Sequence, residues 1–230
     1  LAQQRGGGAG QPPAAPAPAG RGGQAAAPPE VPPALLFKEE FQQSMSALGT
    51  PTSPRHNPGN MYYLAAQSAI KNPSVELKLY GKDTKNVAVY LHEGRFDLWT
   101  GLTGEPVAIL VKHRNNFLDL TGLARVRATV RTNNLHRLNP AVRLADGTLA
   151  AGERAIDTNG EFLVFDVAFT RQRWYTIESD TLAVKGPIQD IKLDRVDEVG
   201  FVDLAPAGGH GQSGWVNVSQ IEVYAKPVPR

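Results

Sequence analysis

Short runs in which apolar and polar side chains alternate fill most of the chain after residue 75. In the first run, Val75, Leu77 and Leu79 are separated by Glu76 and Lys78. The later runs are Val87–Leu91, Val107–Val111, Val126–Val130, Val142–Leu144, Phe162–Phe169, Trp174–Ile177, Val199–Val202 and Val218–Tyr224. Successive side chains of a strand point to opposite faces of its sheet, so this pattern predicts about nine half-buried strands.

The segments between these runs are short and rich in turn-forming residues, such as Asp146-Gly147 and Asn159-Gly160. Long stretches with helical periodicity are almost absent. The pattern therefore predicts an all-β protein, built as an antiparallel two-sheet β-sandwich of the jelly-roll type.

The composition changes near Pro32-Pro33, where a segment of mostly Gly, Ala, Pro and Gln ends. We divide the chain into a low-complexity extended arm at residues 1–34, a connecting segment packing on the sandwich at 35–74, and a β-sandwich domain at 75–230. Within the connecting segment, residues 38–41 suit a short strand or a helical turn. Residues 61–70 suit a short helix or an extended piece.

The arm has too few apolar side chains to fold by itself, and we expect it to dock on another protein. The candidate docking residues are its cations and its paired prolines: Arg5, Pro12, Pro13, Arg21, Pro28 and Pro29. The expected partners are other subunits of a larger periplasmic-side membrane complex or extracellular assembly.

Charge and cysteine content narrow the possible functions. The chain has 24 basic and 22 acidic residues without a basic tract, which is against nucleic-acid binding. The absence of cysteine excludes disulfides, thiolate metal sites, cysteine catalysis and a lipoprotein anchor.

A chain that starts at Leu1 suggests a removed signal peptide, so we expect a periplasmic or extracellular protein. No apolar run spans a bilayer, so membrane association would go through partners.

Two clusters are candidates for ligand binding. In the first, Arg95, Asp97 and Trp99 would form an aromatic, hydrogen-bonding wall of a groove. Alternatively, the apolar side chains Phe96, Leu98 and Trp99 cover a sheet edge while Arg95 and Asp97 pair on the surface. The remaining tryptophan, Trp174, lies in strand-like alternation and is predicted to be in the core.

The second cluster is the glycine-rich loop Gly208–Trp215. Its glycines allow close approach of the backbone to a ligand, His210 and Gln212 can bond to hydroxyl groups, and Trp215 can stack on a sugar ring. Alternatively, the segment is a long loop between strands whose tryptophan closes the end of the core.

Catalytic and metal-binding patterns are not evident. The five histidines lack zinc spacing, and no nucleophile elbow is present. The carboxylates Asp194, Asp197 and Glu198 lie close in sequence, but glycoside hydrolysis needs two carboxyl groups that face each other across the substrate. The sequence therefore predicts a protein without catalytic residues, metal or cofactor. Arg125 and Arg127 lie on the same face of their strand. They form either a solvated row of charges or a surface that binds an acidic partner.

Several segments resemble galactose-binding-like jelly rolls. They are the turn Asp119–Leu123 before Ala124–Thr132, the run Val196–Leu204, and the last strand Val216–Ala225. The likeness is greatest to the group that contains the complex I intermediate-associated protein 30 domain and some carbohydrate-binding modules. This resemblance implies either sugar binding or a role in assembling larger complexes.

Two hypotheses of function follow. The first is a non-enzymatic, exported structural or accessory subunit that docks through its N-terminal arm. The alternative is a carbohydrate-binding module that uses the Gly208–Trp215 loop and Trp99. A hydrolase or lyase acting on sugars is a third possibility, for which the sequence offers no motif.

Overall fold

The computed structural model describes residues 30–41, 44–49, 60–64, 67–92, 95–205 and 214–230. The predicted docking residues, which run from Arg5 to Pro29, lie outside the described residues. His210 and Gln212 of the glycine-rich loop lie outside them as well.

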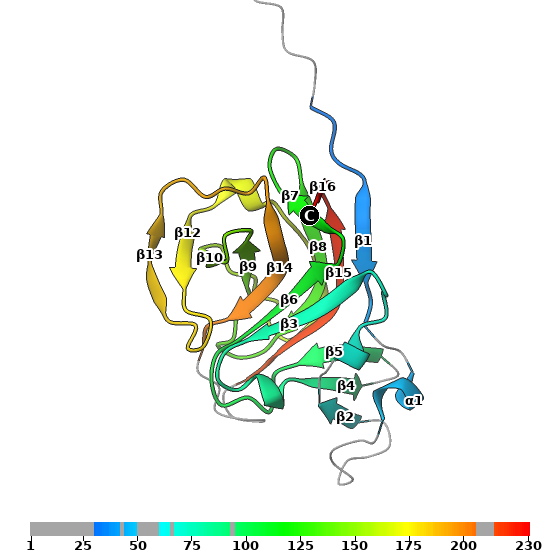
Figure 1. The fold of residues 1–230 in the computed structure, drawn as a ribbon. Helices are drawn as coiled ribbons and strands as arrows, with labels where there is room; N and C mark the ends of the chain where they lie inside the picture. The colour runs from blue at the N-terminus through cyan, green and yellow to red at the C-terminus, as the bar shows by residue number, and fades with distance from the viewer. Residues whose placement is uncertain (1–29, 42–43, 50–59, 65–66, 93–94, 206–213) are drawn as a thin grey trace, which may run out of the picture.

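The described residues form two antiparallel sheets (Figure 1). Sheet A has the order β11-β8-β15-β5-β4-β2, and β1 also pairs with β15. Its strands are β1 (Leu35–Glu39), β2 (Asn60–Leu64), β4 (Ala88–His92), β5 (Arg95–Trp99), β8 (Arg125–Thr132), β11 (Leu163–Val167) and β15 (Val216–Tyr224).

Sheet B has the order β13-β12-β10-β9-β14-β6-β3, while β7 pairs with both β14 and β16. Its strands are β3 (Val75–Tyr80), β6 (Val107–His113), β7 (Asn116–Asp119), β9 (Asn139–Leu144), β10 (Leu149–Gly152), β12 (Trp174–Ile177), β13 (Val184–Ile188), β14 (Val196–Asp203) and β16 (Lys226–Pro229). The helical segments are one turn long: α1 (Met45–Leu48), η1 (Gln67–Ala69), η2 (Thr84–Asn86) and η3 (Phe169–Arg171).

The two-sheet antiparallel sandwich predicted from the alternating pattern is confirmed. On β8, Val126, Ala128 and Val130 are fully buried between the sheets, while Arg125 and Arg127 lie on the opposite face. Trp174 is 1% exposed, which confirms its predicted place in the core. The period of two thus separated core from surface correctly along this strand.

The segment 35–74 contributes more than a connection. It supplies β1 and β2, which pair with β15 and β4, so it is part of sheet A. The buried carboxylate of Glu39 accepts hydrogen bonds from the backbone N–H groups of Phe41, Lys71 and Asn72. These bonds tie the end of β1 to the chain that leads into β3.

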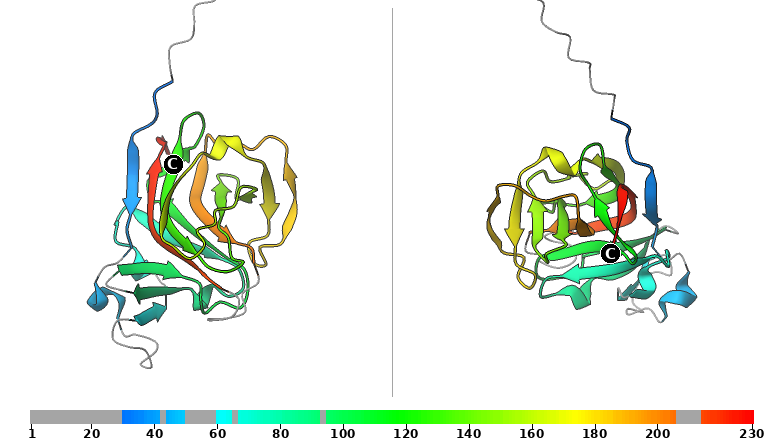
Figure 2. Two further views of the ribbon diagram at one scale, coloured as in Figure 1. Left: turned by 180° about the vertical axis from the view of Figure 1, so that it is seen from behind. Right: turned by 45° about the horizontal axis from the view of Figure 1, so that its top comes forward.

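Sheet B curls strongly, so that β13, β12, β10, β9 and β14 form an open ring beside sheet A (Figures 1 and 2). The turn after β12 reaches the end of β3, where the Gly81 N–H donates to the Ser179 carbonyl at 2.9 Å. Inside this curl, a second apolar cluster that includes Leu110, Leu149 and Leu182 covers the far face of sheet B. The face of sheet A that is turned away from the core is called here the outer face of sheet A.

Within the described part of the chain, no helix is long and apolar enough to cross a membrane.

Candidate functional site

Strand β5 brings all three residues of the first predicted cluster to the outer face of sheet A. Phe96 and Leu98 point into the core between the sheets. Because side chains alternate along a strand, Arg95, Asp97 and Trp99 point the other way.

Strand pairing adds residues from distant parts of the chain to this face. Tyr90 on β4 lies directly across from Asp97, and Tyr62 on β2 lies across from Tyr90. Asn217 on β15 lies between Trp99 and Arg131 of its two neighbouring strands. Directly opposed positions on one face are close enough for side-chain contact.

Asp97 is the buried centre of this group. It is 1% exposed, and the Asn217 side-chain amide donates a hydrogen bond of 2.6 Å to its Oδ1. Burial raises the pKa of Asp97 to about 7, although the Asn217 hydrogen bond and the nearby Arg131 and Arg95 act in the opposite direction. Burial also raises the pKa of Tyr90, and the Asp97 charge adds to that effect. At neutral pH the Asp97 carboxyl is therefore divided between its neutral and charged forms.

Three buried polar atoms of this group have no hydrogen-bond partner among the described residues: Asp97 Oδ2, Asn217 Oδ1 and Arg131 Nε. Leaving a buried donor or acceptor unpaired costs about 1–3 kcal/mol each. The set contains two acceptors and one N–H donor on adjacent strands. These atoms lie below the accessible surface, so water or a ligand hydroxyl would reach them only where the covering side chains move aside.

The aromatic side chains beside this polar centre are layered. Trp99 is 3% exposed, and its ring lies 4.7 Å from that of Tyr90 and 5.9 Å from that of Tyr62. A Cβ atom at Gly101 would lie 2.0 Å from the indole, so glycine leaves the room that this ring occupies. Trp99 is thus buried behind two tyrosines that are themselves half-buried, and the tyrosines hold the surface positions.

Phe162 lies over the other side of the polar centre. The guanidinium carbons of Arg95 and Arg131 lie 5.1 and 5.8 Å from the centre of its ring. The turn before Phe162 is fixed to β8 by two reciprocal hydrogen bonds between the backbone N–H groups and hydroxyls of Thr132 and Thr158. The ring is therefore held in place by the sheet that it covers.

A hollow of about 380 Å³ lies between the end of β1 and the start of β5, where Arg95 lines it. Both strands pair with the same edge of β15. Strand β5 pairs with residues 217–218 of β15, and β1 pairs with residues 221–224, so the edge between these two segments has no partner strand among the described residues. A β-bulge between Val218 and Gln220 interrupts the ladder at this point. The hollow is lined by Glu40, Arg95, Phe96, Thr129, Ser219 and Gln220.

The glycine-rich loop contributes only its end to the described structure. Trp215 is half-buried, and its carbonyl accepts a hydrogen bond from the Asn133 N–H at 3.0 Å. Gly214 has φ of 100°, and a Cβ there would lie 2.3 Å from the Asn133 carbonyl oxygen, so glycine is required.

Nearby, the buried side chains of His136 and Asp203 lie 2.6 Å apart. The sequence did not point to this pair, since 66 residues separate its members along the chain and only the fold brings them together.

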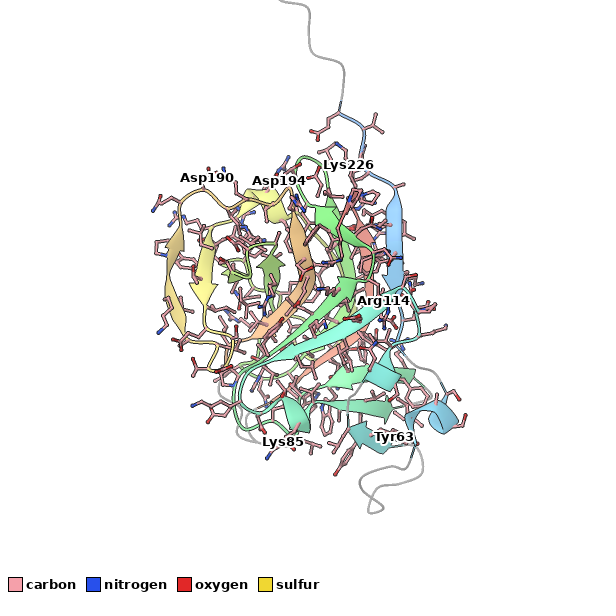
Figure 3. All side chains as sticks on the ribbon, viewed as in Figure 1. Tyr63, Lys85, Arg114, Asp190, Asp194 and Lys226 are labelled. Atoms are coloured by element: carbon pink, nitrogen blue, oxygen red, sulfur yellow. The ribbon has the colours of Figure 1, made fainter. Side chains whose placement is uncertain are left out.

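The three carboxylates that are close in sequence go to separate places. Asp197 is bound by Lys112, at 3.0 Å, and by Arg230. Glu198 accepts a hydrogen bond of 2.7 Å from the Tyr80 hydroxyl, and burial raises its pKa. Asp194 lines a separate pocket of about 500 Å³ at the end of the ring where Asp190 also lies (Figure 3). Among the described residues, no group of three or more His, Cys, Asp or Glu side chains is placed to hold a metal ion.

Comparison with known proteins adds little to this description. No family model matches the sequence, and no curated protein matches it. Among solved structures, the chain is similar to CtCBM11, studied in solution, with 9% identity, a TM-score of 0.37, and coverage of 82% of this chain and 95% of that one. It is also similar to the family 11 carbohydrate-binding module from Clostridium thermocellum in complex with a β-1,3-1,4-mixed-linked tetrasaccharide, with 11% identity, a TM-score of 0.37, and coverage of 84% and 98%.

A third similar structure is the family 11 module of the cellulosomal cellulase Lic26A-Cel5E of Clostridium thermocellum. It has 14% identity and a TM-score of 0.35, and the alignment covers 75% of this chain and 91% of that one. Likeness of this degree transfers no ligand and no residue role to the present chain. The class that the fold and the candidate site define is an antiparallel β-sandwich with a polar and aromatic surface on one sheet.

Proposed function

We propose that this protein is a non-catalytic carbohydrate-binding module that holds its ligand on the outer face of sheet A. The observation that carries the proposal is the group of half-buried aromatic side chains around the buried polar centre of Asp97, Asn217 and Arg131. Arg95, which contacts the Phe162 ring, also lines the hollow beside β1.

The chemistry of this face matches that of a sugar ring. A pyranose offers hydroxyl groups that donate and accept hydrogen bonds around its edge, and apolar C–H groups on its two faces. The acceptors Asp97 Oδ2 and Asn217 Oδ1 suit hydroxyl protons, and the Arg131 N–H suits a hydroxyl oxygen. Tyr62, Tyr90 and Phe162 supply aromatic surface around these groups.

The partners of the surrounding carboxylates favour binding over catalysis. Asp166 on this face is held by Arg127 and Arg125, and Asp197 and Glu198 lie on the other sheet with partners of their own. Two-carboxylate hydrolysis of glycosides requires a second carboxyl group facing the first across the substrate. The other carboxylates near this face are bound as well: Glu40 by Lys38 and Lys71, and Glu222 by the Gln220 amide and the Tyr224 hydroxyl.

The test is a screen of soluble polysaccharides by affinity electrophoresis and titration calorimetry. We expect binding of at least one polymer, and Tyr90→Leu should weaken it at least about tenfold, equivalent to ~1.4 kcal/mol. Tyr175→Leu is the matched control, since it changes a half-buried tyrosine of sheet B. Failure to bind any glycan, or equal losses in the two variants, would contradict the proposal.

Docking through the arm is a second proposal, supported by the composition of residues 1–34. Export to the periplasm or outside the cell, and kinship with the complex I intermediate-associated protein 30 group, likewise stay predictions from the sequence.

A deletion of residues 1–34 tests the docking role. We expect the shortened chain to unfold at the same temperature as the full chain. When the larger assembly is sedimented, the full chain should be found in it and the shortened chain should not. Removal of Glu30, which accepts a hydrogen bond from the Leu123 N–H at the surface, should have little effect on stability. Stoichiometric incorporation of the shortened chain would exclude docking through the arm.

A further inference from the structure

The cations on the outer face of sheet A fall into two groups. Arg125 and Arg127 are neutralised by Asp166, at 3.3 and 2.9 Å, and Lys38 by Glu40, at 2.6 Å. Arg95 and Arg131 differ from them, because no described carboxylate lies within ion-pair distance of either guanidinium. Among the described residues, these two guanidiniums therefore have no ion-pair partner, and Asp97, which feels the charge of both, is the nearby acid.

The two guanidiniums contact the same aromatic ring. Both contact the ring of Phe162, and they come from strands β5 and β8, which flank β15. The nearest acid, Asp97, is buried and bonded to Asn217, and the Nε–H of Arg131 has no acceptor although it is buried. An anion bound within reach of both guanidiniums would gain Coulomb attraction from each of them.

Guanidinium groups suit ring-bound acidic groups by their shape as well as by their charge. Their N–H donors lie in one plane and match the two oxygens of a carboxylate, and they also bind sulfate oxygens. The hollow of about 380 Å³, which Arg95 lines, leaves space for such a group beside the sheet.

We propose, resting on the carbohydrate-binding function above, that the ligand is an acidic glycan whose carboxylate or sulfate is held between Arg95 and Arg131. The ring of the same sugar lies against the half-buried aromatic side chains of this face, above the buried polar centre. Uronate and sulfate polymers share the chemistry that the two arginines recognise.

The experiment measures binding of the full chain to polygalacturonate, dextran sulfate, dextran and mixed-linkage β-glucan by titration calorimetry at low and high salt. We expect at least one acidic polymer to bind ten times more tightly than either neutral polymer, and this advantage to shrink in high salt. Arg95→Gln and Arg131→Gln should each reduce binding of the acidic polymer at least tenfold. The two acidic polymers distinguish a carboxylate site from a sulfate site.

Arg127→Gln is the matched control, because it removes the same charge from the same face but from a guanidinium already paired with Asp166. It should change the affinity for the acidic polymer by no more than twofold. Equal losses of affinity in all three variants would show that net charge alone determines binding, and would overturn the inference. Equal affinity for neutral polymers, unchanged by Arg95→Gln, would also overturn the inference but leave the carbohydrate-binding function standing. Binding of none of the four polymers would overturn both. Arg95 is exposed, so its variant should remain folded, as thermal unfolding will verify.

Discussion

Replacing Asp97 by asparagine is expected to raise the free energy of unfolding at pH 8 by ~4 kcal/mol. The pKa of Asp97 is about 7 in the folded protein against an ordinary value of 3.8, because burial disfavours its charged form. Asparagine has the same shape, keeps an acceptor for the Asn217 amide and carries no charge that must be buried. The gain follows from removing the cost of ionising a buried carboxyl group.

The pH dependence of this effect has a definite sign. Below pH 4 both the folded and the unfolded chain hold the Asp97 proton, so the substitution changes little. Between about pH 4 and pH 7 only the folded chain keeps the proton, so this residue makes the wild-type protein less stable as the pH rises. Above pH 7 the full cost is present, and the variant should show its greatest advantage there.

Urea unfolding of both proteins between pH 4 and pH 9 measures this difference. The control is Asp166→Asn on the same sheet face, where Arg127 holds the pKa of the carboxyl below its ordinary value. That substitution should give no gain at alkaline pH, because it removes an ion pair. An Asp97→Asn variant that gains no stability between pH 5 and pH 8 would show that Asp97 ionises without cost in the folded protein.

Replacing Gly200 by alanine is expected to destabilise the protein by ~3 kcal/mol or more. Gly200 lies in β14 between β9 and β6, and a Cβ there would lie 2.2 Å from the Ile109 carbonyl oxygen and 2.8 Å from the Leu110 Cα atom. Both are backbone atoms of the central ladder, so they cannot move aside as a flexible side chain would. For a protein of this size, such a loss lowers the midpoint of thermal unfolding by roughly 6–12 °C.

Gly186→Ala is the matched control for this substitution. Gly186 also lies in a strand of sheet B, but nothing lies within 4 Å of a Cβ added there. Alanine should stabilise the protein slightly, by ~0.5–1 kcal/mol, because it restricts the unfolded chain more than glycine does. Opposite shifts of the two melting temperatures are thus expected, and similar shifts would refute the close backbone approach at Gly200.

The sequence predicted the sandwich well because strand periodicity is a local property. Val126, Ala128 and Val130 could be assigned to the core, and Arg125 and Arg127 to the surface, from β8 alone. The segment 35–74 was harder, because its strands are short and lie among turn-forming residues. Their place in sheet A depends on pairing with β15 and β4, which no local pattern records.

The candidate site was found in part. The cluster Arg95, Asp97 and Trp99 was recognised from its residue types, and alternation with Phe96 and Leu98 could have placed it on the surface of a sheet. Tyr62, Tyr90 and Phe162 were not recognised as its neighbours, and Asn217 was not connected with it. Asn217 lies 120 residues from Asp97 along the chain, although their side chains form a hydrogen bond.

By itself, the sequence determined the class of fold and the alternation of core and surface on strands such as β8, whereas β6 and β14, predicted to be half-buried, are buried on both faces. It could do so because these properties depend on neighbours one or two positions away. Only the tertiary structure decided that Asp97 is buried, that Trp99 lies behind two tyrosines, and that Arg95 and Arg131 share one aromatic ring. Burial and charge pairing depend on which strands become neighbours, and that order is set by the packing of the whole chain.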